Sequence, residues 1–328
     1  MLFYIGKRVV YGLIAIWLIS ILSFIIIQLP PGDYVSSYIA NLAAQGSSLD
    51  QAEAENLRIF YGLDKPWHVQ YGKWALRILT GDLGYSFEWE KPVMDVLSSR
   101  LLMTILLALF ALLFTWVFAI PIGIYSAVRQ HSPEDYVFTF VGFLGLAVPD
   151  FLLALWLLWV SFSYFGQNVG GLFSLEYLNA PWSLGRLLDL ISHLWIACLV
   201  VGTAGTASLI RVMRANLLDE LQKPYVITAR AKGMREWKVV LKYPVRVAIN
   251  PLISTLGYLL PYLISGSIIV SVVLNLPTEG PLLLKALFNE DLFVSAAIVL
   301  ILGTMTVIGT FISDILLAIV DPRIRLTR

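Results

Sequence analysis

The chain has 328 residues, of which 58% are hydrophobic and only 14% are charged, and its formal net charge is +1. A soluble protein of this length normally has about a quarter of its residues charged, so the composition indicates a membrane protein that crosses the bilayer several times. The single cysteine, Cys198, excludes a disulfide framework, and nothing in the sequence suggests a pair of metal ligands.

The first apolar run begins directly after Lys7 and Arg8. Residues 9–29 contain no charge, and about twenty such residues are enough to span a bilayer. A cleaved signal peptide is the alternative, but the run is longer than a typical signal-peptide core and no small-residue cleavage site follows it. We therefore expect an uncleaved first span, with the N-terminus in the cytoplasm.

A long polar segment, residues 30–100, follows the first span. Within it, residues 50–63 and 67–79 have the pattern of short amphipathic helices, and the tryptophans are suited to a membrane surface. We expect this segment to be a small cap outside the cytoplasm. It is a candidate contact for a substrate-delivery protein, and simple folding over the helical bundle is the alternative.

Five further apolar segments predict five more spans: residues 101–128, 136–165, 191–212, 251–276 and 293–320. Six spans place both termini in the cytoplasm. The inner segments then contain 15 of the 23 lysine and arginine residues, which agrees with the positive-inside rule. The predicted fold is therefore an all-α polytopic membrane protein with six transmembrane helices in a single domain, residues 1–328.

The most basic part of the chain, residues 211–250, lies between the fourth and fifth spans. Pro224 can begin a helix, because the missing N–H of a proline needs no partner there. Gly233 follows where a left-handed residue would end that helix. Residues 235–248 have the apolar spacing of a second helix, and Pro251 suits the first turn of the next span. The predicted unit is either a docking element for a soluble partner or a basic loop that only fixes topology and touches lipid headgroups.

Three stretches carry a family resemblance. Tyr225-Val-Ile-Thr-Ala-Arg-Ala-Lys-Gly233 strongly resembles the cytoplasmic EAA loop of ABC importer permeases, in the form found in the dipeptide, oligopeptide and nickel branch. Gly81-Asp-Leu-Gly84-Tyr-Ser86 with Pro92-Val93 resembles an extracytoplasmic motif of the same family. Asp321-Pro-Arg-Ile-Arg325 resembles its C-terminal ending. With the hydropathy, the resemblance covers essentially the whole chain, and it implies the architecture of a type I ABC importer transmembrane domain.

In that family, the short helix of the EAA loop is a coupling helix that lies in a groove of an ATPase subunit. The resemblance therefore implies an ATPase-docking function for Tyr225, Thr228, Ala229, Arg230, Ala231, Lys232 and Gly233. The glutamate of the EAA label corresponds to Thr228 here, which is usual for this branch and removes one polar contact with the ATPase.

A second departure from the family pattern lies in residues 275–281, where a P-G-x-G turn is common. Pro277 and Gly280 retain turn chemistry, but Thr278, Glu279 and Pro281 are unusual. This loop is expected to cap the pathway from outside. Whether the substrate is a peptide or an oligosaccharide therefore stays open.

No G-x-x-x-x-G-K-[ST] motif occurs, so we expect neither a P-loop nor any cofactor on this chain. The three histidines are isolated and no nucleophile elbow is present, which gives an enzymatic function little support. The resemblance implies two separate ATPase subunits that bind ATP and Mg²⁺, a second permease, and an extracytoplasmic substrate-binding protein. We expect the assembly in the inner membrane of a prokaryote, surrounded by lipid bilayer and without a nucleic-acid partner.

Asp150 follows Pro149 about fourteen residues into the third span, roughly 21 Å along a helix. A carboxylate near the midplane is costly unless it faces a polar cavity or a partner. Asp150 is therefore a candidate for the translocation path, and the alternative is a kink residue that bonds freed backbone or a neighbouring helix. Asp314 lies near the inner surface, where we expect a structural pair with a basic residue of the loop.

The resemblance also places the fifth span beside the path. Its polar candidates are Ser254, Ser265, Ser267 and Ser271, and hydroxyls in membrane helices usually bond their own backbone or a neighbour. The hinge candidates are Pro149, Gly257 and Pro261. Two alternative functions are an ion-gradient-driven secondary transporter, for which the membrane offers few relay residues, and a non-transporting membrane scaffold or sensor.

Overall fold

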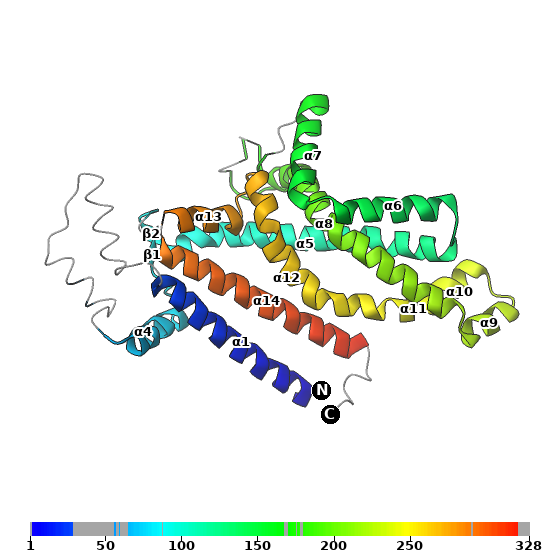
Figure 1. Ribbon diagram of the computed structural model, residues 1–328, viewed down its shortest axis with the longest axis horizontal. Coiled ribbons are helices and arrows are strands. Elements are labelled where there is room, and N and C mark those ends of the chain that lie inside the picture. The colour runs from blue at the N-terminus through cyan, green and yellow to red at the C-terminus, as the bar shows by residue number, and fades with distance from the viewer. Residues whose placement is uncertain are drawn as a thin grey trace. The chain divides into compact units, whose positions relative to one another are not determined.

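The computed structural model describes residues 2–28, 56, 59, 65–86, 88–166, 170–174, 176–177, 180–289 and 291–320. At residues 2, 3, 165, 257, 258, 260, 261, 264, 265 and 320 it describes the backbone alone. The chain divides into two compact units: unit 1 is residues 1–8, 103–281 and 308–328, and unit 2 is residues 9–102 and 282–307. The helices with residues in both units are α1 (Leu2–Gln28), α5 (Val93–Val128), α13 (Glu279–Phe288) and α14 (Leu292–Val320) (Figure 1).

The described residues are almost entirely helical, which confirms the predicted all-α membrane fold. Four helices are long and apolar enough to cross a membrane: α1, α5, α8 (Leu184–Leu221) and α14. A fifth span results if α6 (Pro133–Ala147) and α7 (Asp150–Phe165) count as one. The segment predicted as the fifth of six spans forms α12 (Asn250–Val273), and the total of six stays a prediction.

The predicted third span is not one straight helix, because α6 and α7 meet at an angle of 106°. Val148 precedes Pro149 and has an extended backbone, with φ −85° and ψ 123°. A proline disfavours the helical conformation in the residue before it, so the helix ends there. Asp150 is consequently the first residue of α7 and not a residue inside a continuous span.

Unit 1 is built around α8, against which α6, α7, α11 (Pro244–Ala248) and α12 pack. Glycines permit this close approach. A Cβ atom added to Gly145 of α6 would lie 2.5 Å from Thr203 Cγ2 of α8, and one added to Gly205 of α8 would lie 3.2 Å from Leu259 Cδ1 of α12. Lipid tails are as apolar as leucine, so helices in a membrane associate through close packing of this kind and not through the hydrophobic effect.

An ion pair between Asp135 of α6, which is buried, and Arg214 of α8, which is partly exposed, connects α6 to α8. Asp135 is 3% exposed, and its two carboxylate oxygens accept hydrogen bonds from Arg214 Nε at 3.0 Å and Arg214 Nη2 at 2.8 Å. Ser126 Oγ and the His131 N–H also donate to this carboxylate. Buried charges are tolerated when they are paired and hydrogen-bonded in this way.

Two assignments of basic residues change with the structure. Arg211 and Arg214, grouped with the basic loop in the sequence, lie in α8, which continues to Leu221. Asp314 pairs with Arg8, with 3.2 Å between Arg8 Nε and Asp314 Oδ2, and not with the basic loop as predicted. The sequence could not show this pair because its two members are separated by almost the whole chain.

In unit 2, α4 (Trp67–Leu79) coincides with a predicted amphipathic helix, whereas most of the other, residues 50–63, lies outside the described residues. Strand β1 (Tyr85–Ser86) pairs antiparallel with β2 (Lys91–Pro92). Ser86 Oγ donates to Asp291 Oδ2 at 2.6 Å, so the extracytoplasmic motif is attached to the residue that precedes α14. The C-terminal motif, residues 321–325, lies outside the described part of the chain.

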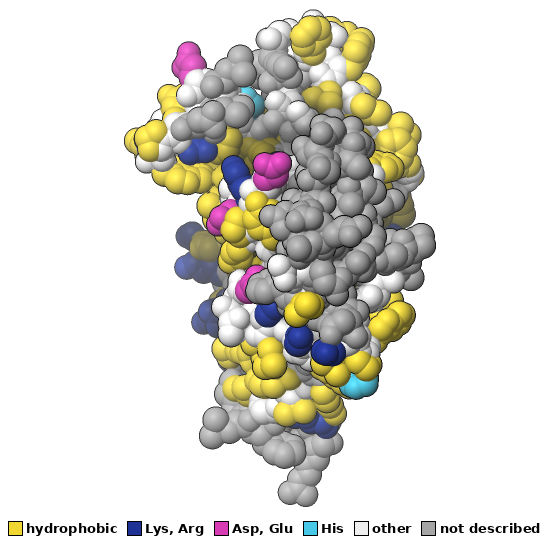
Figure 2. All heavy atoms as spheres, turned by 90° about the vertical axis from the view of Figure 1, so that its left-hand side faces the viewer, with side chains coloured by type: hydrophobic (Ala, Val, Ile, Leu, Met, Phe, Trp, Pro, Cys, Tyr) yellow, Lys and Arg dark blue, Asp and Glu magenta, His cyan; other side chains and the backbone are white. Residues whose placement is uncertain are grey.

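Hydrophobic side chains are exposed over much of the described surface (Figure 2). On α1, for example, Leu13, Trp17 and Leu22 are each more than half exposed. In water so many exposed apolar side chains would favour aggregation, whereas lipid tails solvate them. The exposed surface therefore supports the same conclusion as the helix lengths, that the chain is a multi-pass membrane protein.

Candidate functional site

The loop between α8 and α12 has the helix, glycine corner and second helical segment that the sequence predicts. Helix α9 (Pro224–Ala231) begins at Pro224, and Lys232 follows as its C-cap. Gly233 has φ +75°, in the left-handed region that favours glycine. The glycine therefore permits the sharp turn after α9.

The second segment is not one helix over residues 235–248, as predicted, but two: α10 (Glu236–Lys242) and α11. Tyr243 separates them, with φ −113° and ψ −77°. Pro244 causes the break, because it has no N–H to donate and its ring clashes with the preceding turn. One residue, Ile249, separates α11 from α12, and it has helical backbone angles.

The loop has a small hydrophobic core of its own. Val226 and Ala229 of α9 pack against Val239 of α10, and all three are buried. Met234 and Tyr243 pack against this cluster. Helix α9 is thereby fixed against α10, so the two helices move together.

A second link between α9 and α10 is the ion pair of Arg230 and Glu236, with 2.6 Å between Arg230 Nη2 and Glu236 Oε1. The hydrogen bonds of this pair lower the pKa of Glu236 and raise the pKa of Arg230. Both side chains are substantially exposed, so the pair contributes less than about 1 kcal/mol to stability. The apolar contacts are therefore the main link across Gly233.

Tyr225 is attached to the end of α8, because its hydroxyl donates a hydrogen bond to the Glu220 carboxylate. Burial and this neighbouring carboxylate raise the pKa of Tyr225 to about 12, so the phenol stays protonated at physiological pH. The contact fixes the start of α9 relative to α8.

The structure divides the predicted docking residues into two groups. Ala229 points into the loop core, whereas the following residues are exposed: Tyr225, Thr228, Arg230, Ala231, Lys232 and Gly233. The residue that the sequence analysis missed is Ile227, a large apolar side chain that is 57% exposed. Helical spacing could have predicted that Ile227 is exposed. Val226 and Ala229 are three residues apart and share one face of the helix, whereas Ile227 lies on another face.

The structure also places the candidates for the translocation path. The Tyr262 hydroxyl donates to Asp150 Oδ2 at 3.1 Å, which connects α12 to the start of α7. Ser267 and Ser271 are buried, and Ser254 is exposed. The backbone of α12 is helical through the hinge candidates Gly257 and Pro261 and through Ser265. The side chains of Pro261 and Ser265 lie outside the described atoms.

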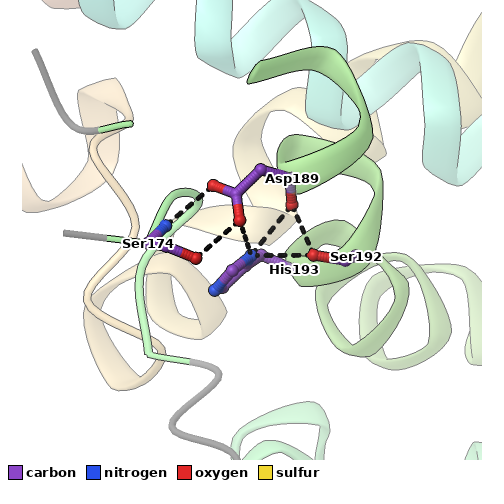
Figure 3. A network of polar contacts seen from close by, with 4 residues as sticks. All are labelled: Ser174, Asp189, Ser192 and His193. Carbon is purple, nitrogen blue, oxygen red and sulfur yellow. Dashed lines mark hydrogen bonds and ion pairs between the residues drawn. The ribbon is translucent and has the colours of Figure 1, made fainter. Parts of the chain in front are cut away.

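Four residues before and within α8 form a polar network (Figure 3). Asp189 accepts hydrogen bonds from the Ser174 N–H at 2.8 Å and from Ser174 Oγ at 2.5 Å, and it lies 3.6 Å from His193 Nδ1. Ser192 Oγ contacts the same Nδ1 atom and donates to the main-chain oxygen of Asp189. A catalytic triad uses both imidazole nitrogens, one for the serine and one for the acid, so this network ties the preceding loop to α8 and is not a nucleophile.

The described residues contain no group of three or more His, Cys, Asp or Glu side chains that could hold a metal ion. The geometry instead provides a small rigid loop that presents a mixed basic and apolar helix, α9, next to the helical bundle of unit 1. Such a surface fits docking of another protein better than it fits catalysis.

Comparison with known proteins shows the family of the chain. Residues 119–326 match the family described as the inner membrane component of binding-protein-dependent transport systems, and residues 1–109 match the family of its N-terminal part. The chain is 36% identical to the oligopeptide transport system permease AppB of Bacillus subtilis, over 98% of both chains. It is 35% identical to a protein of Brucella ovis named as a peptide permease, over the full length of both. It is also 33% identical to the glutathione transport system permease GsiC of Pectobacterium atrosepticum, over 99% of both.

These matches extend over nearly the whole chain and include the loop whose geometry is described above. The chain belongs to the family of binding-protein-dependent transport system inner membrane components and is a permease subunit of an ABC importer.

Proposed function

We propose that this permease imports peptides across the inner membrane of a prokaryote. It does so with a second permease, two ATPase subunits and an extracytoplasmic binding protein. Relatives named for oligopeptide, peptide and glutathione transport support the substrate class. The chain itself has no P-loop motif, so ATP and Mg²⁺ bind to the ATPase subunits. In this proposal α12 completes six spans, and both termini are cytoplasmic.

Helix α9 is the proposed ATPase-docking element. The observation that carries this proposal is an exposed apolar residue, Ile227, on a helix held rigid by its own buried core. Tyr225 of α9 and Trp237 of α10 are also large apolar side chains with more than a third of their surface exposed, so Ile227 is not a single apolar residue on this loop. Tyr225, Thr228 and Ala231 accompany Ile227 on the exposed part of α9.

The test is co-purification of the ATPase subunits with this chain, tagged, from detergent-solubilised membranes. Ile227→Glu should reduce ATPase recovery at least about tenfold, since burying an unpaired charge in an interface costs more than 1.4 kcal/mol. Ile227→Leu is the matched control and should retain the ATPases. Unchanged recovery with Ile227→Glu would show that α9 does not dock the ATPase through this residue.

The structure suggests how movement of α9 reaches the membrane. Helix α10 packs on α9 and α11, and α11 contacts both α8 and α12. A displacement of α9 by the closing ATPases would thus be passed through the loop core to α12, where Gly257 and Pro261 are the proposed hinges. Rigid-body displacement of packed helices is an established mode of switching.

Gly233 tests this coupling, because its φ of +75° is strained for any residue with a branched side chain. Gly233→Val should reduce ATP-dependent uptake several-fold, by detaching the ATPases or by leaving ATP hydrolysis uncoupled from transport. Gly233→Asn should keep most of the activity, since asparagine tolerates the left-handed conformation. Equal uptake by both variants and the unmodified protein would exclude a coupling role for this corner.

Asp150 is the proposed contact for a polar or cationic group of the substrate. It lies at the break between α6 and α7, where the backbone is interrupted, and one of its oxygens is bonded to Tyr262. A carboxylate in the membrane region is favourable where it faces a polar path. The structural alternative is that the bond to Tyr262 only fastens α7 to α12.

Two substitutions separate these roles in reconstituted transporters. If Asp150 contacts substrate, Asp150→Asn should lower the uptake of cationic peptides several-fold without reducing assembly, and Tyr262→Phe should have a smaller effect. If the pair only fastens the helices, both variants should reduce the amount of assembled complex to a similar extent, and the proposed substrate contact would be excluded.

A further inference from the structure

The turn between α12 and α13 leads into a buried carboxylate at the first position of α13 that the proposed function does not use. Glu279 is 1% exposed, and neither of its carboxylate oxygens has a hydrogen-bond partner. The hydroxyls of Thr278 and Ser271 are also buried without a partner. Nearly all buried polar groups in proteins are paired, so three unpaired side chains between residues 271 and 279 indicate a functional constraint or a second state.

The turn is held tightly in its present position. The Glu279 N–H donates to Thr104 Oγ1 of α5 at 3.1 Å, and the Leu276 N–H donates to the Ser271 carbonyl at 2.8 Å. Gly280 approaches α12 so closely that an added Cβ would lie 3.0 Å from the Ile268 Cα. Glu279 is therefore enclosed by α5 and α12, and water can reach its carboxyl group only if the turn moves.

The charged groups around this turn do not compensate Glu279. Helix α12 has no charged residue. On α5, the cation nearest to Thr104 in the sequence is Arg100, and it makes no contribution to the pKa of Glu279. On α13, Lys285 lies 3.1 Å from Glu88 Oε1. Burial alone raises the pKa of Glu279 to about 7, and no neighbouring charge contributes.

We propose that protonation of Glu279 holds this turn closed and that loss of the proton favours its opening. An ionised carboxylate is costly when it is enclosed without a partner, whereas an open turn lets water hydrate it. The inference rests on the proposed function in one respect, because we expect this turn to lie at the outer mouth of the path. The mouth would then open more readily at neutral and alkaline pH.

The direction and size of the effect follow from linkage. In the open turn the carboxyl has its ordinary pKa of 4.5, and in the closed turn its pKa is about 7. Below pH 4.5 both forms are protonated and pH has no effect. The closed form loses relative stability as pH rises from 4.5 to 7, and the change is complete above 7. Between pH 6 and pH 8, the ratio of open to closed turns should rise about tenfold.

Hydrogen exchange of the backbone amides of residues 271–281 measures this opening directly in the purified, assembled transporter. After correction for the intrinsic pH dependence of exchange, the unmodified protein should open about tenfold more at pH 8 than at pH 6. Glu279→Gln cannot ionise and should show no such difference. Glu176→Gln, the same substitution at an exposed position, should behave like the unmodified protein.

An equal corrected exchange at both pH values in the unmodified protein would overturn the proposal, and so would a tenfold difference that persists in Glu279→Gln. If Glu279→Gln does not fold, the pH profile of the unmodified protein still decides, since the rise must level off above about pH 7. Exchange is measured without substrate or ATP. Its result is therefore independent of the experiments on ATPase docking and peptide uptake.

Discussion

Close packing against α8 is the constraint on which unit 1 depends. A bilayer gives helices no hydrophobic reason to associate, so α6, α7, α11 and α12 are held by contacts that need small side chains, such as Gly145 and Gly205, and by satisfied polar groups. The Asp135–Arg214 pair, near the end of α8, is such a set of satisfied polar groups. Replacing Arg214 would leave the buried charge of Asp135 without its partner.

The loop between α8 and α12 follows a different principle, because it has a small core of its own. Val226, Ala229 and Val239 hold α9 on α10, and this leaves Ile227 exposed. A loop that only fixed membrane topology would need basic residues but no internal packing. The core and the exposed apolar residue are therefore the features that support the proposed coupling function of this loop.

The sequence predicted features that depend on local chemistry. The start of α9 at Pro224, the left-handed Gly233 and the bounds of α4 follow from capping rules and apolar spacing. Features that depend on distant residues were missed or wrong. The bond between Tyr262 and Asp150 and the pairing of Asp314 with Arg8 join residues far apart in the chain. Pro149 was a hinge and kink candidate from the sequence, whereas the break at Pro244 was missed because apolar periodicity outweighed the proline.

The central claim is that this permease is driven by ATP hydrolysis on partner subunits and not by an ion gradient. The most direct measurement is peptide uptake into vesicles that contain the assembled complex, with ATP removed while the proton and sodium gradients are kept intact. Uptake should stop without ATP and should continue when ATP is supplied and both gradients are collapsed. Uptake that persists without ATP and stops with the gradients would contradict the account and identify a secondary transporter.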